Sequence, residues 1–350
     1  MKFFVQHPYK ERIEVNIGAI TLIVGLNKEL KYYIWQILSW YFGGKKYSSE
    51  DLSIFDYEEP TILDETGEIV KRSSYHYIDI SSFKDLLEQM EYKKGTLAQG
   101  YLSKIVNQVD VVAYLEKINE QVELIEGAIN QHINLNSGQV EYHLENQPLT
   151  LDQLLSKNFS PFFAIENKNL SFEWVSNTDK LFLFLEMLNR LLSQTTEKYL
   201  IVLKNIESFV SEESYDSFYN EIGRLVKKYP NLTCILFPSD QGYLKIDEKS
   251  SRFVNILSDQ VEHLYDIEFM YERVKKHYPS NNFPTREGFR KSLENVTPYL
   301  LTKMVRQPSL SLVDSVILSI LNQLFQFNYR IRYSQTPDEE LLHRYLESKN

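Results

Sequence analysis

Residues 20–32 read ITLIVGLNKELKY, an apolar run that leads into a short loop and then into a helix-like pattern. The nucleotide-binding template G-x-x-x-x-G-K-[ST] can be laid on this stretch, with Gly25 as the first glycine and Lys31 as the lysine. Two positions fail. Leu30 replaces the second glycine, whose conformation lets backbone N–H groups wrap a phosphate, and Tyr32 replaces the small hydroxyl that holds Mg²⁺. The stretch predicts a degenerate phosphate loop on an NTPase-like scaffold, with an ordinary strand-turn-helix as the alternative.

A second apolar run, Tyr199–Leu203, has the length and composition of a buried strand in a parallel sheet. In a working NTPase a carboxylate follows such a strand and holds the metal ion. Here Lys204 and Asn205 follow, and Glu207 comes too late to sit at the strand end. A lysine at this position repels a divalent cation. The sequence therefore predicts a protein that is not an enzyme and that binds no nucleotide here.

Composition limits the class of protein. The chain has 350 residues, of which 43% are hydrophobic and 13% aromatic, which is enough for two domains with sizeable cores. We expect no signal peptide and no membrane span, because the first residues lack a long apolar segment and the longest uncharged window, 315–329, is short and polar. The single cysteine, Cys234, lies in an apolar run and predicts a core thiol in a cytoplasmic protein.

The formal net charge of −10 is unevenly distributed. Residues 51–150 hold 7 Lys/Arg against 18 Asp/Glu, whereas residues 1–50 hold 7 against 4 and the last hundred hold 13 against 12. Because the acidity is confined to one segment, a basic face elsewhere is compatible with the acidic total, and nucleic-acid binding is not excluded.

The order of patterns predicts an α/β fold in three parts. We expect a discontinuous α/β head with a parallel-sheet core over 1–80 and 149–265, because strand-like and helix-like runs alternate there with short connections. A long α-helical leg is inserted over 81–148, and 266–350 form a helical C-terminal module. Short strands are predicted at Ile54-Phe55 and at Ser171–Trp174.

The leg is predicted as one helix over about 101–133, because the stretch has no proline and a single glycine. At roughly 1.5 Å per residue such a rod is about 50 Å long. Apolar residues at 3-4-3-4 spacing form a seam typical of a helical hairpin or coiled coil; they are Leu115, Ile118, Val122, Ile125 and Ile129. Alternation downstream puts Glu141, His143 and Glu145 on one strand face, where their oxygen atoms are candidate ligands for Ca²⁺.

These features together resemble the accessory protein of type II-A CRISPR adaptation, in its long-form subgroup. The resemblance covers residues 1 to about 240 and is carried by the degenerate loop, the acidic helical insertion, the segment 149–155 and the paired runs 200–205 and 231–238. The last hundred residues are similar to the extension of the long forms.

The resemblance implies a homotetrameric ring that encircles double-stranded DNA, loads at free ends and has no ATPase activity. Its partners would be the CRISPR integrase proteins and the RNA-guided nuclease, in spacer acquisition for antiviral defence. Several members bind Ca²⁺ beside the leg, where Glu141 and Glu145 are the candidates here. The basic candidates for the DNA channel are Lys157 first, then Lys168, Lys93, Lys94, Lys71 and Arg72.

Two other functions stay open at this point. One is an active P-loop ATPase of the DNA recombination or maintenance type. The other is a protein-interaction scaffold that never contacts DNA. Neither the basic pairs nor the helix seam distinguishes among the three, since each pattern also occurs on ordinary solvated surfaces.

Overall fold

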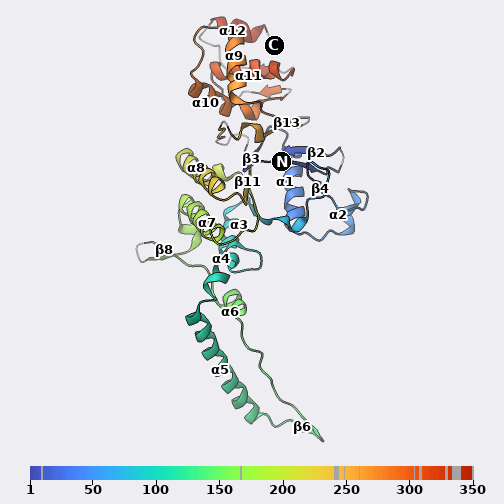
Figure 1. The fold of residues 1–350 in the computed structure, drawn as a ribbon, viewed down its shortest axis with the longest axis vertical. Coiled ribbons are helices and arrows are strands. Elements are labelled where there is room, and N and C mark those ends of the chain that lie inside the picture. The colour runs from blue at the N-terminus through green and yellow to red at the C-terminus, as the bar shows by residue number, and fades with distance from the viewer. Residues whose placement is uncertain are drawn as a thin grey trace. The chain divides into compact units, whose positions relative to one another are not determined.

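The computed structural model describes residues 1–8, 11–165, 168–239, 244–247, 249–259, 261–302, 304–306, 310–327, 330–332 and 340–348. The chain folds into two compact units. Unit 1 comprises Met1–Ser82 and Thr196–Asn350, and unit 2 comprises Phe83–Thr195 (Figure 1). This division groups residues 149–195, which the sequence assigns to the head, with the predicted leg, and it groups the C-terminal helices with the head.

A six-stranded sheet in the order β13-β12-β3-β11-β10-β5 forms the centre of unit 1. Five of these strands are parallel, and β13 pairs antiparallel with β12. The predicted parallel-sheet core with crossover connections is confirmed in this mixed α/β fold. The strands are β3 (Ile20–Val24), β5 (His76–Ile80), β10 (Tyr199–Lys204), β11 (Leu232–Phe237), β12 (Val254–Leu257) and β13 (Val261–His263).

All five residues of β3 are buried, which explains why this run is continuously apolar rather than alternating. Helix α1 (Lys28–Phe42) follows β3, and α8 (Glu212–Lys228) connects β10 to β11. A small antiparallel sheet in the order β2-β1-β4 adjoins this core. Its strands are β1 (Lys2–Val5), β2 (Ile13–Asn16) and β4 (Ile62–Leu63), and short elements nearby are α2 (Ser49–Ser53), η1 (Arg72–Ser74) and η3 (Ile206–Phe209).

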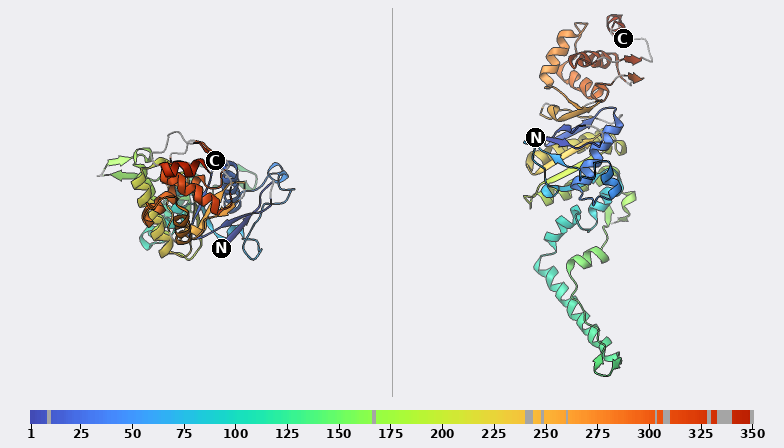
Figure 2. Two further views of the ribbon diagram at one scale, coloured as in Figure 1. Left: turned by 90° about the horizontal axis from the view of Figure 1, so that it is seen from above. Right: turned by 90° about the vertical axis from the view of Figure 1, so that its right-hand side faces the viewer.

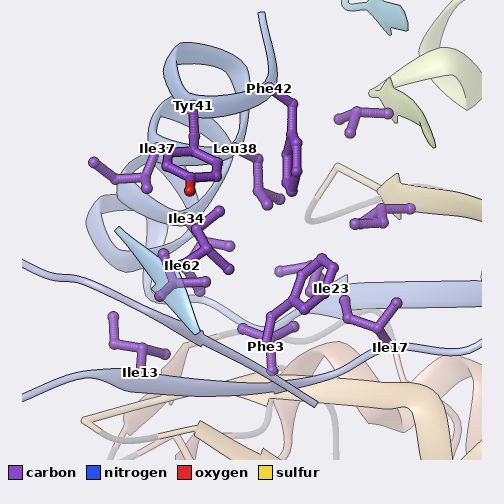
Figure 3. Packing of buried hydrophobic residues seen from close by; sticks show 14 of the residues in the cluster. Phe3, Ile13, Ile17, Ile23, Ile34, Ile37, Leu38, Tyr41, Phe42 and Ile62 are labelled. Atoms are coloured by element: carbon purple, nitrogen blue, oxygen red, sulfur yellow. The ribbon is translucent and has the colours of Figure 1, made fainter. Parts of the chain in front are cut away.

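A hydrophobic cluster of this unit joins α1 to the small sheet (Figure 3). Ile34 and Leu38 of α1 point toward Phe3 and Ile62, and each of these four side chains is at most 1% exposed. Burial of this kind stabilises the fold by roughly 1.5–3 kcal/mol per large apolar side chain. Cys234, on β11, is also buried, as predicted.

Unit 1 ends in a helical module that also contains two short paired strands. Buried Asn322 of α11 accepts a hydrogen bond from Leu301 N (3.0 Å), and the Tyr265 ring stacks on Phe325 with centroids 4.9 Å apart. The elements are η4 (Ser251–Phe253), α9 (Ile267–His277), α10 (Arg286–Val296), η5 (Thr297–Tyr299), β14 (Met304–Arg306), α11 (Leu312–Leu324), β15 (Arg330–Arg332) and α12 (Glu340–Glu347).

Unit 2 consists of a small helical core and an extended leg. In its core, α7 packs against α3 and α4, and Lys180 is buried with its ammonium 4.8 Å from the Phe172 ring centroid. The elements are α3 (Phe83–Met90), α4 (Leu97–Ile105), α5 (Val109–His132), β6 (Asn136–Ser137), β7 (Val140–Glu141), α6 (Leu151–Asn158), β8 (Phe163–Ile165), β9 (Lys168–Leu170), η2 (Phe172–Trp174) and α7 (Asn177–Leu192).

The leg is α5 together with an extended return segment, residues 142–150 (Figure 2). Two asparagines of α5 bind this segment in the manner of backbone groups. Asn119 bonds both the N–H and the C=O of Leu149 (2.8 and 3.1 Å), and Asn130 does the same for Leu144 (2.9 and 2.8 Å). Within the chain, α5 is therefore paired with an extended segment and not with a second helix.

Three predicted elements differ in the structure. The single helix over 101–133 is broken into α4 and α5, because the Asn107 side chain donates to Ser103 O (2.9 Å) and ends α4; at 24 residues, α5 is about 36 Å long. Ile54-Phe55 is a turn after α2, since Phe55 is buried under α1. Ser171–Trp174 is mostly the 3₁₀ turn η2, which buries Phe172 and exposes Trp174.

Candidate functional site

The carboxyl edge of the parallel sheet is where ligands bind in open α/β folds, and here it carries the degenerate loop. Gly25 follows β3 with φ of +110°. A Cβ built on Gly25 would lie 2.4 Å from Leu257 O and 2.8 Å from Leu257 N. The glycine is thus required by the close approach of the β12 backbone, which lies directly against the first residue of the loop.

The loop itself is only three residues long, because α1 already begins at Lys28. Asn27 caps the helix by accepting a hydrogen bond from Leu30 N (3.0 Å), and its amide donates to Ser258 O (2.6 Å). Leu30, the residue at the second-glycine position of the template, lies buried in the first helical turn. The backbone N–H of Leu30, one of the groups that an anion would need at this helix N-terminus, is therefore bonded by the chain itself.

Lys31 also contacts protein rather than open space. Its ammonium donates a hydrogen bond to Pro238 O, just after β11. Glu207, which is 5% exposed, accepts a hydrogen bond from Ser239 N through Oε1. Lys31 and Glu207 therefore bind adjacent residues of the segment that leaves β11.

Lys204, at the end of β10, lies over the indole of Trp35, with its Nζ 3.7 Å from the ring centroid. Burial lowers the pKa of Lys204, and the nearby Asp79 carboxylate opposes that shift. Asp79 lies opposite Val202 in the adjacent strand β5. Its two oxygen atoms accept hydrogen bonds from Trp35 Nε1 (3.1 Å) and from the Tyr77 hydroxyl (3.2 Å).

Sequence reasoning missed Asp79, the carboxylate that lies beside the strand end where a metal-binding acid is expected. The only signal was an acid inside the alternating run His76–Ile80. Because indole and phenol donors occupy both of its oxygen atoms, Asp79 holds α1 against the sheet. The whole edge is a packed and hydrogen-bonded junction of α1, β5, β10 and β11.

Five of the six basic candidates are exposed. Lys157 lies in the last turn of α6, and Lys168 begins β9. Lys93 and Lys94 lie between α3 and α4, and the Glu91 carboxylate beside Lys93 raises its pKa. These four belong to unit 2, and Lys71 belongs to unit 1.

Arg72, the sixth candidate, is half-buried and forms hydrogen bonds with backbone carbonyl groups at the end of α1. Its guanidinium donates to Tyr41 O (3.0 Å), Trp40 O (3.2 Å) and Lys45 O (2.6 Å), and it pairs with Glu59 at 3.3 Å. These contacts use most of its five N–H donors, so few remain for a DNA phosphate.

The predicted calcium ligands lie on the return side of the leg. Glu141 ends β7 and contacts His143 Nε2 at 3.2 Å, and Glu145 lies in the extended segment beyond it. The strand is only two residues long, so the predicted alternation does not extend to Glu145. Over the described residues there is no group of three His, Cys, Asp or Glu side chains that could hold a metal ion. Ca²⁺ takes about six to eight oxygen ligands, so the two carboxylates do not make a site by themselves, and calcium binding stays a prediction.

The leg carries a large amount of exposed apolar surface. No residue of α5 is buried, and within the seam Ile118, Ile125 and Ile129 are 41%, 58% and 44% exposed. None of the described helices combines the length and the hydropathy needed to cross a bilayer. Exposed apolar stripes of this size on a water-facing helix are typical of protein–protein contacts.

Comparison with known proteins identifies the family. The family profile described as CRISPR-associated protein Csn2 subfamily St matches residues 5–347. The crystal structure of Stu0660 of Streptococcus thermophilus is similar with a TM-score of 0.90 and 86% sequence identity, over 99% of this chain and 100% of that one. A search of curated proteins found no match. The chain therefore belongs to the Csn2 family of CRISPR-associated proteins, subfamily St, as the sequence resemblance indicated, and this membership implies a role in spacer acquisition.

Proposed function

We propose that this chain acts in spacer acquisition as a non-enzymatic homotetrameric ring that encircles double-stranded DNA. The family match over nearly the whole chain carries the proposal. The ring would retain DNA by closure, while lysines such as Lys157 and Lys168 contact phosphates without reading bases. Binding would then be independent of sequence and sensitive to salt.

The geometry of the sheet edge supports a role without ATP hydrolysis. A nucleotide would need the loop N–H groups, the Lys31 ammonium and a free carboxylate for its metal ion. Here Asn27 caps the helix, Lys31 binds Pro238 O, and Asp79 accepts two hydrogen bonds. We infer that the NTPase-like scaffold is retained as structure, and the packed edge disfavours the active-ATPase alternative.

The exposed seam of α5 supports assembly. A monomer would leave Ile118, Ile125 and Ile129 in water, whereas pairing of two legs would bury them at roughly 25 cal/mol per Å² of apolar area. The integrase proteins and the RNA-guided nuclease of the same CRISPR system are the proposed partners of the assembled ring.

Three measurements on the purified protein test this function. Light scattering should give the mass of four chains. A mobility-shift assay at low salt should show linear duplex bound and a closed circle of the same sequence bound much more weakly, since a closed ring must load at an end. The rate of ATP hydrolysis with the protein should equal the background rate in buffer alone. A monomeric mass, or no shift of linear DNA, would refute the ring, and in the second case a protein scaffold would be the better description.

A further inference from the structure

Unit 1 contains a cavity of about 500 Å³ at the edge of the sheet opposite the degenerate loop. It adjoins Ala19 and Ile20, at the amino end of β3, whereas Gly25 follows the carboxyl end of that strand. Five strand residues at about 3.3 Å each separate the two places by roughly 16 Å. The cavity is thus independent of the loop, and its volume falls in the range of roughly 300–1,000 Å³ that is typical of small-ligand sites.

Four cationic side chains from three parts of the chain line this cavity. They are Lys227 of α8, Lys249 and Arg252 around η4, and Arg290 of α10. All four are exposed. None of them forms an ion pair with a carboxylate among the residues that the structure describes. Four other cations between the start of α8 and the end of α10 do pair with an acid; they are Arg224, Lys245, Arg286 and Lys291.

One carboxylate, that of Asp247, also lines the cavity. Its Oδ1 accepts hydrogen bonds from Lys249 N (2.8 Å) and Ser250 N (2.7 Å), so this oxygen holds the turn before η4. The lining therefore has four positive charges against one negative charge. Such an arrangement is stabilised by a ligand that carries several negative charges, and the two guanidinium groups favour phosphate because they can bind it in a bidentate manner.

The floor of the cavity is apolar and is shaped by a glycine. Ile20, Val226 and Phe253 contribute to it. A Cβ built on Gly18 would lie 2.3 Å from Cδ2 of the Phe253 ring, so only glycine allows the ring to occupy its place. The Arg252 guanidinium lies 4.8 Å from the centroid of the same ring. An aromatic surface beside cations is a common support for a nucleobase.

We propose that this cavity binds a free nucleotide, with its phosphates on Lys227, Lys249 and the two arginines and its base on the apolar floor. The site goes beyond the proposed DNA ring and involves no hydrolysis, since the Asp247 oxygen that faces the turn is already bonded to backbone. In this chain the nucleotide would lie between the amino end of β3 and helices α8 and α10.

The test is binding of fluorescently labelled ATP to the full chain, with pyrophosphate and adenosine as competitors. We expect saturable binding of one ATP per chain, weaker competition by pyrophosphate and none by adenosine, since phosphates supply most of the affinity. Lys227→Glu and Arg290→Glu should each weaken binding at least about tenfold. Gly18→Ala, which displaces Phe253, should weaken ATP more than pyrophosphate.

Two matched variants distinguish binding in this cavity from binding elsewhere on the chain. Lys276→Glu changes the charge by the same amount at an exposed position of α9 outside the cavity, and Lys31→Ala alters the loop; both should leave ATP binding within about twofold. The proposal would be overturned if Lys276→Glu weakened ATP binding as much as the cavity variants, or if Lys31→Ala weakened it. It would also be overturned if binding were not saturable at roughly 1 mM ATP, or if duplex DNA displaced the bound ATP. Loss in Lys31→Ala together with ATP turnover would also contradict the ring function, whereas the other outcomes would leave it intact.

Discussion

At the residue scale, the polar and charged side chains around the degenerate loop form hydrogen bonds with backbone groups of the protein itself. Lys31 occupies the position where an NTPase would bind phosphate, and Glu207 is a buried acid three residues beyond β10, yet both bind the segment after β11. Asn27 is similar, since it caps α1 and also bonds Ser258 O. Lys31 and Asn27 thus link α1 to the segments that follow β11 and β12, and Glu207 links η3 to the segment after β11.

Replacement of Lys31 by alanine should therefore affect stability. The variant leaves Pro238 O without its charged partner, and loss of such a hydrogen bond costs about 1.5–3 kcal/mol. Urea denaturation should show a lower midpoint for Lys31→Ala than for Lys46→Ala, an exposed lysine just after α1. An unchanged midpoint combined with weaker nucleotide binding would indicate a phosphate-binding lysine instead.

His263 of β13 should make the fold sensitive to acid. Burial lowers the pKa of His263, while Glu14 and Glu262 raise it and Lys2 lowers it further, with burial as the largest effect. A lowered pKa means that the folded state holds the neutral ring, so stability is complete above the ordinary His pKa of about 6.5 and falls as the pH drops through the folded value. Urea midpoints between pH 7.5 and pH 5 should fall less in His263→Gln than in the parent protein. Equal losses would assign the acid sensitivity to other groups.

At the scale of elements, the leg shows how a helix can be stabilised without a helical partner. No residue of α5 is buried, and the hydrogen bonds that join it to the return segment come from Asn119, Asn130 and Glu126. Each asparagine supplies one donor and one acceptor to a backbone unit that would otherwise be bonded only to water.

Removal of one asparagine should release the return segment locally. Asn119→Ala loses both bonds to Leu149, and hydrogen exchange of residues 142–150 should become faster, while exchange in β3 and β11 stays unchanged. Glu123→Ala, an exposed change on the same helix, is the matched control. Unchanged exchange in Asn119→Ala would mean that the segment is held by other contacts.

At the scale of the whole molecule, assembly should depend on the seam of α5. Placing two carboxylates on it, with Ile118→Glu and Ile125→Glu together, should shift the light-scattering mass to a smaller species, since buried unpaired charges oppose association. Gln131→Glu, on the opposite face of α5, should keep the parent mass. If both variants keep the parent mass, the subunits associate through another surface.

The DNA surface can be tested by its salt dependence. Lys157→Glu should weaken duplex binding and reduce the slope of log affinity against log salt by about one unit, since each phosphate contact contributes about 0.9. Lys276→Glu again provides the matched charge change. An unchanged slope in Lys157→Glu would mean that this lysine does not contact DNA phosphates.

Sequence patterns predicted the strands β3, β10 and β11, the helix α7 and the leg because each depends on neighbours a few positions away in the chain. The strand predicted at Ile54-Phe55 was wrong, since a propensity for strand gave way to burial of Phe55 under α1. The predicted helix 101–133 is interrupted near Asn107, whose side chain caps the end of α4. Nothing in the sequence distinguishes this capping asparagine from an ordinary exposed one.

The sequence by itself determined the α/β class, the parallel crossover and the loss of the phosphate-binding motif, because all three follow from local periodicity and from which residue types are missing. Only the tertiary structure decided what the remaining groups do. Lys31 meets Pro238 across 207 positions of sequence, and Asn27 meets Ser258 across 231. The cavity beside Lys227 and Arg290 likewise exists only after distant elements have packed together, since contacts at such separations are set by the whole fold.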